Sequence, residues 1–163
     1  MSRIDELQAT QHLALKLSRV LNQAYEALSE DEEKTDIDTY IIEPSGKRVS
    51  IQNVTSEGDV LWNMNRNTKA FNNNRAFEAR EVNHLKWTRE VLTKKEAMGY
   101  SKPEELVIVV RGSMPTAPPN LITQLKPTMS RFAGIYYVSV PNTDQESGYI
   151  LALKPYRKTP DLF

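Results

Sequence analysis

The stretch "DTYIIEPSGKRVSIQNV", residues 38 to 54, contains two short runs of alternating apolar residues on either side of a Pro-Ser-Gly turn. β-Branched residues that alternate with polar ones and are joined by turn formers are typical of a β-hairpin. If the turn pairs Glu43 with Lys47, opposed residue numbers keep a constant sum, so Asp38 lies opposite Gln52. This register predicts a buried face of Ile37, Ile41, Val49 and Ile51 and a polar face of Asp38, Tyr40, Ser50 and Gln52.

Helices are predicted on both sides of this hairpin. Apolar residues recur at helical spacing over about residues 3 to 28, and a similar apolar stripe predicts a helix over about residues 75 to 98, with Gly99 as its stop. Between the hairpin and the second helix, residues 59 to 65 fit either a third strand or a bend. The Asn-rich stretch that follows competes with regular hydrogen bonding and indicates a loop.

The C-terminal third predicts strands separated by loops. Residues 105 to 110, "ELVIVV", form a continuous apolar run of the kind found in strands covered on both faces. A short, proline-interrupted helix is expected over residues 121 to 132, and strands over 134 to 140 and 149 to 156. We therefore predict one mixed α/β domain over residues 1–163, with a central mixed sheet flanked by helices. Its predicted core includes Leu17, Leu21, Leu85, Val107 and Val109.

Composition excludes several classes of site. The 163 residues include no cysteine, which excludes disulfides, thiol nucleophiles and cysteine-ligated metals. The longest apolar runs fall far short of the roughly 20 residues that span a bilayer. Acids and amides interrupt the N-terminal stretch where a secretory signal needs an apolar core, so we expect a cytoplasmic protein.

Charge is unevenly distributed although the formal net charge is zero. Residues 1 to 36 carry four bases against eight acids, whereas residues 64 to 102 carry nine bases against four acids. Bases interleaved with amides and aromatic rings are suited to contacts with DNA or RNA, although such a region can also be a solvated surface. If nucleic acid binds, we expect it to follow a path along Arg66, Lys69, Arg75 and Arg80.

A helix, a hairpin entered by an acidic residue, a second helix and a buried strand together resemble the PD-(D/E)xK restriction-endonuclease-like superfamily. The phrase at residues 38 to 54 resembles its active-site hairpin, in which an Asp opens one strand and a Glu-x-Lys triplet lies on the next. The first acid then corresponds to Asp38, the second acid to Gln52 and the lysine to Val54. An alternative alignment puts Ser50 at the second acid and Gln52 at the lysine.

The resemblance implies a metal-dependent nuclease, with Mg²⁺ as cofactor, Asp38 as metal ligand, and Asp38 and Gln52 as catalytic residues. Because an amide and a valine replace the usual acid and lysine, it also implies a degenerate site. Candidate substitute acids are Glu26, Glu43, Glu57 and Asp59. The chain is thus expected to be a nuclease-fold protein in nucleic-acid processing or binding. The alternative is a non-enzymatic protein-interaction or regulatory module, which zero net charge favours.

Overall fold

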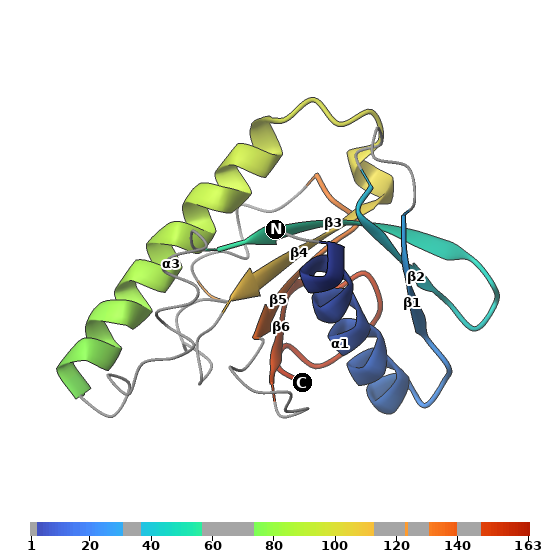
Figure 1. The fold of residues 1–163 in the computed structure, drawn as a ribbon, viewed down its shortest axis with the longest axis horizontal. Coiled ribbons are helices and arrows are strands. Elements are labelled where there is room, and N and C mark those ends of the chain that lie inside the picture. Colours follow the sequence, from blue (N-terminus) through green and yellow to red (C-terminus); the bar gives the residue numbers. More distant parts are fainter. Residues whose placement is uncertain (1–2, 31–36, 57–73, 113–122, 124–130, 140–147) are drawn as a thin grey trace.

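The described strands form one mixed sheet with α1 and α3 on opposite faces (Figure 1). This computed structural model describes residues 3–30, 37–56, 74–112, 123, 131–139 and 148–163. Within them the elements are α1 (Arg3–Leu21), β1 (Glu26–Ser29), β2 (Thr39–Ile42), β3 (Arg48–Thr55), α3 (Asn74–Ala97), a 3-10 turn (Pro103–Glu105), β4 (Leu106–Gly112), β5 (Gly134–Ser139) and β6 (Ile150–Lys154). The strand order is β1-β2-β3-β4-β5-β6. The predicted mixed α/β class is confirmed.

The β2–β3 hairpin has the predicted register. Ile41 pairs with Val49, and the amide of Glu43 donates to the carbonyl of Lys47 at 2.9 Å. Gly46 adopts a φ of 87° in the turn, a conformation that glycine tolerates without steric cost. Ile41 and Val49 are buried on one face, as the alternation predicts.

Strands β3, β4 and β5 run parallel to one another, whereas the pairs β1–β2, β2–β3 and β5–β6 are antiparallel. A parallel pair needs a crossover connection, and α3 lies in the chain between β3 and β4. Its bounds agree with the predicted helix to within one residue at each end. Every residue of β4 and β5 is buried, which confirms that a continuous apolar run marks a covered strand.

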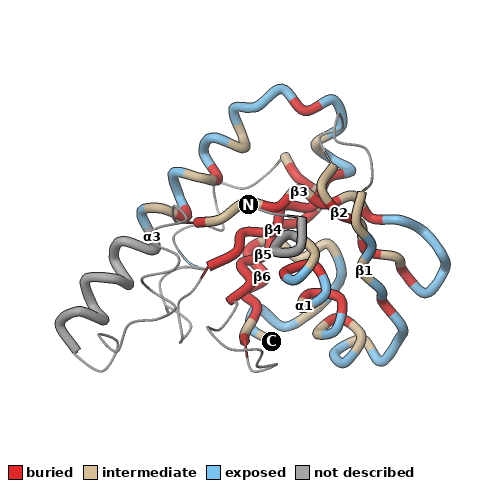
Figure 2. The backbone as a smooth tube through the Cα atoms, in the orientation of Figure 1, coloured by how far each residue is buried: buried red, intermediate tan, exposed pale blue. Residues whose placement is uncertain are grey.

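Two hydrophobic clusters occupy the two faces of the sheet, and Figure 2 shows the buried backbone concentrated along the central strands. On one face, α1 packs on alternate residues of β2, β3 and β4, with Leu17, Val107 and Val109 fully buried as predicted. On the other face, Leu92 of α3 packs with the intervening residues of β4 and β5. Leu21, also predicted to be buried, is only half-buried at the end of α1.

The predicted first helix extends too far. The helix ends at Leu21, where Asn22 adopts a left-handed φ of 53°, and the Ser18 hydroxyl accepts a hydrogen bond from the amide of Tyr25 at 3.0 Å. Residues 26–29 then form β1 against β2. Leu28 keeps helical spacing in the sequence, but pairing along β2 determines its conformation, because tertiary contacts override a weak local preference.

Several predictions lie outside the described residues. These are the strand or bend at 59 to 65, the Asn-rich loop, and nearly all of the short helix at 121 to 132. The side chain of Leu85, which is predicted to be buried, is also outside the described part. Within the described part, no helix has the length and apolar character that crossing a bilayer requires.

Candidate functional site

Asp38 and Gln52 form a hydrogen-bonded pair where the hairpin opens. Asp38 directly precedes β2, and its amide donates to the carbonyl of Ile51 at 2.9 Å, which fixes it opposite Gln52. Its Oδ2 accepts from Nε2 of Gln52 at 2.6 Å and from the amide of Asn53 at 2.8 Å. The predicted cross-strand neighbours are therefore confirmed, on the face opposite Ile41. The carboxylate is held by two donors from the same strand.

Lys95 on α3 is the cation whose charge is felt by Asp38. It lies one helical turn beyond the buried Leu92 and is half-buried. Burial lowers the pKa of its ammonium group, and the Asp38 carboxylate partly opposes this shift. The resemblance places Val54 at the lysine position and does not point to Lys95. The spacing from Leu92 could have suggested that Lys95 faces the sheet, although not that it meets β2.

Tyr100 also approaches the pair from the segment that follows α3. Its hydroxyl is 3.5 Å from Oε1 of Gln52, a long contact, and its ring meets Phe132 edge-on with centroids 6.0 Å apart. The Gln52 amide thus has its nitrogen toward Asp38 and its oxygen toward Tyr100. This orientation follows from chemistry, because an ionised carboxylate can only accept.

On the α1 face, the same strand ends carry neutral polar groups. Nδ2 of Asn53 donates to the Thr39 hydroxyl at 2.9 Å, and that hydroxyl lies 2.7 Å from the hydroxyl of Thr10 on α1. All three residues are buried. Since the Asn53 amide also binds Asp38, this network fixes the carboxylate relative to α1. Buried hydrogen bonds of this kind hold a strand end rigidly.

The groups around Asp38 are poor ligands for magnesium. Mg²⁺ prefers oxygen ligands in octahedral geometry, but Gln52 presents its nitrogen to Asp38. Among the described residues, no three His, Cys, Asp or Glu side chains lie close enough together to hold a metal ion. Val54, at the lysine position of the resemblance, packs against the apolar cluster below α3. A role of Asp38 as magnesium ligand and of Gln52 in catalysis stays a prediction.

Two of the candidate substitute acids lie at the wrong end of the hairpin. Glu43 follows β2 and binds Arg157, and Glu26 lies beside Ile42 at the same end. Five residues of extended chain separate Glu43 from Asp38, about 16 Å. Glu57 and Asp59 lie outside the described residues.

The predicted nucleic-acid contacts are only partly placed. Arg66 and Lys69 lie outside the described residues, and Arg75 and Arg80 belong to α3, with side chains that are not described. The described half of that helix carries exposed bases, namely Lys86, Arg89 and Lys94. Contact with nucleic acid therefore stays a prediction for all four residues.

Comparison of the chain with protein-family models, with curated proteins and with solved structures found no match in any of the three.

Proposed function

We propose that this chain is a restriction-endonuclease-like protein that binds DNA or RNA in the cytoplasm and does not hydrolyse it with magnesium. The observation that carries the proposal is the hydrogen-bonded pair of Asp38 and Gln52 across the hairpin. The pair supports the resemblance because Asp38, at the start of β2, lies opposite Gln52, the residue aligned with the family's second acid. It also supports degeneracy, because an amide occupies that second position.

The charges near the pair favour phosphate binding. Lys95 is half-buried within electrostatic range of Asp38, and α3 continues with exposed bases on its described half. Phosphate oxygens are bound by lysine, arginine and amide donors, all of which this region supplies. A single carboxylate among such donors supplies little negative charge to hold a divalent ion.

Fluorescence polarisation with labelled single- and double-stranded DNA and RNA, at several salt concentrations, tests the binding. Affinity should fall with salt, and Arg75→Gln combined with Arg80→Gln should reduce the logarithmic slope on duplex DNA by about 1.8, or 0.9 per lost phosphate contact. Lys47→Gln, an exposed base in the β2–β3 turn, is the matched control and should leave the slope unchanged. An unaltered slope in the double variant would contradict the assigned path.

Hydrolysis is tested on the same substrates with magnesium. We expect no cleavage by the unaltered protein, whereas Gln52→Glu combined with Val54→Lys restores the residue types of the resemblance and should produce some. Robust magnesium-dependent cleavage by the unaltered protein, abolished by Asp38→Ala, would overturn the non-hydrolytic assignment.

The second candidate function is a non-enzymatic interaction or regulatory module. It is favoured by the zero net charge and by Leu28, which is 37% exposed on β1 at the edge of the described sheet. Exposed edge strands can pair with a partner chain. If none of the four nucleic acids shows salt-dependent binding, that result would favour this function over the first.

A further inference from the structure

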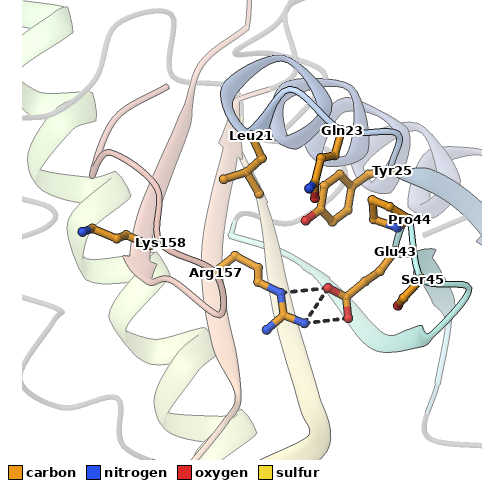
Figure 3. A pocket seen from close by; sticks show the side chains of 8 residues that line it. All are labelled: Leu21, Gln23, Tyr25, Glu43, Pro44, Ser45, Arg157 and Lys158. Atoms are coloured by element: carbon orange, nitrogen blue, oxygen red, sulfur yellow. Dashed lines mark hydrogen bonds and ion pairs between the residues drawn. The ribbon is translucent and has the colours of Figure 1, made fainter.

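A cavity of about 490 Å³ opens at the turn end of the hairpin, at the opposite end of β2 from Asp38 (Figure 3). Three separate segments line it: the end of α1 with the turn after it, the β2–β3 turn, and the chain beyond β6. A volume of this size is in the range that takes a small organic molecule. The cavity shares no residue with the Asp38 site.

Glu43 and Arg157 form a fixed ion pair in its wall. Glu43 is 6% exposed, and Arg157 donates to both of its carboxylate oxygens, with Nε–Oε2 at 2.8 Å and Nη2–Oε1 at 2.7 Å. The hydrogen bond to Glu43 raises the pKa of Arg157. The guanidinium also stacks over the ring of Tyr156, 5.1 Å from its centroid. Glu43 is thereby neutralised, and the guanidinium has one orientation.

Several hydrogen-bond donors in the cavity lining are not used by the Glu43–Arg157 ion pair. Nη1 of Arg157 makes no hydrogen bond to any residue that the structure describes, and in Figure 3 it points away from Glu43. Lys158 is exposed and forms no ion pair within the described residues. In Figure 3 its side chain extends away from Arg157, so its ammonium group reaches a bound anion by turning about its flexible stem. The side-chain amide of Gln23 also faces the cavity. With Glu43 compensated by Arg157, the lining keeps one net positive charge.

The opposite wall carries two large side chains, Tyr25 and Leu21, beside the Gln23 amide. Tyr25 is 8% exposed and half-buried Leu21 lies beside it, and both lie across the cavity from Arg157 in Figure 3. A flat apolar group could pack on this wall while an acidic group reaches Arg157 and Lys158.

A second cavity of about 360 Å³ on the other side of the ion pair provides an internal comparison. Its acids and bases are equal in number, namely Glu43, Glu104 and Glu105 against Lys47, Arg48 and Arg157. Only the first of these two cavities therefore has charge complementary to an anion.

We propose that the 490 Å³ cavity is a binding site for a small organic anion, a carboxylate or phosphate monoester with a flat apolar body. The acidic group is bound by Nη1 of Arg157 and by Lys158, and the body lies on Tyr25 and Leu21. The site is independent of nucleic-acid binding, because it lies at the other end of the hairpin.

The test is titration of the ¹⁵N-labelled chain with benzoate, phenyl phosphate and benzylamine, followed by amide chemical shifts. Benzoate or phenyl phosphate should give saturable shifts at Gln23, Tyr25 and Lys158, and benzylamine none. The anion that binds more tightly identifies the acidic group. Lys158→Gln should weaken binding about five- to tenfold and Lys158→Glu should abolish it, because a charge-assisted hydrogen bond is lost and then replaced by repulsion.

Lys47→Gln, which removes an exposed base of the hairpin turn that does not line this cavity, is the matched control and should bind these anions as the unaltered chain does. The proposal is overturned if neither anion shifts these amides, if benzylamine shifts them equally, or if Lys158→Glu binds as tightly as the unaltered chain. Failure of the nucleic-acid proposal would appear in the polarisation titrations and leave these shifts unchanged.

Discussion

Replacing Gln52 by glutamate tests the physical basis of the candidate site. In the protein, Nε2 of Gln52 lies 2.6 Å from Oδ2 of Asp38, so Gln52→Glu puts a second carboxylate against the first. If the two groups relax to about 4 Å, their repulsion is about 1 kcal/mol in a water-like medium and about 4 kcal/mol near a protein surface. The nearby Lys95 ammonium offsets part of this repulsion. We expect Gln52→Glu to lower the free energy of unfolding at pH 7 by about 2 to 3 kcal/mol.

The pH dependence of this loss has a definite sign. Repulsion raises the folded-state pKa of the carboxylate pair above the ordinary values near 4, so the folded variant binds a proton more tightly than the unfolded chain does. The destabilisation is therefore complete above the raised pKa and shrinks as the pH falls through it. Urea midpoints measured between about pH 4 and pH 8 should converge for variant and unaltered protein at the acidic end.

Magnesium provides an independent measurement on the same variant. Two adjacent carboxylates are a better ligand set than a carboxylate and an amide, so magnesium should raise the urea midpoint of Gln52→Glu. Ser50→Glu is the control, because Ser50 lies opposite Tyr40 on the same face, one pair away from Asp38. Equal pH dependence in the two variants, or no loss of stability in Gln52→Glu, would refute the assigned contact.

Three further outcomes are expected. Leu17→Ala should cost about 2 to 5 kcal/mol of unfolding free energy, because Leu17 is fully buried between α1 and the sheet, and an unchanged urea midpoint would contradict its place in the core. Arg131→Leu should cost about 1 to 3 kcal/mol, because the guanidinium donates to two carbonyls at the C-terminus of α3; amide exchange there should accelerate, whereas exchange in α1 should not. Burial raises the pKa of Tyr136 to about 12. The stability that its protonated hydroxyl contributes is therefore complete below pH 10 and is lost as the pH rises toward 12. Tyrosinate absorbance that develops fully near pH 10 without unfolding would be inconsistent with this burial.

The sequence alone was sufficient for the hairpin and for most of the strands. Alternation with a period of two favours the register that buries Ile41 with Val49, because a slip of one strand by one residue would move its apolar side chains to the other face. The same register predicts the pairing of Asp38 with Gln52, which the structure has. The long helix was predicted to within one residue, since a sustained apolar stripe ended by Gly99 is a strong local pattern.

Contacts between distant segments were decided only by the tertiary structure. Helical spacing continues to Leu28 in the sequence, yet residues 26–29 form a strand because β2 offers backbone partners that no local pattern records. Lys95 lies near Asp38 across 57 positions of chain, and Arg157 binds Glu43 across 114. Sequence periodicity reports which face of an element is buried, but the segment that packs there depends on how the sheet is assembled, so only the folded chain brings these charges together.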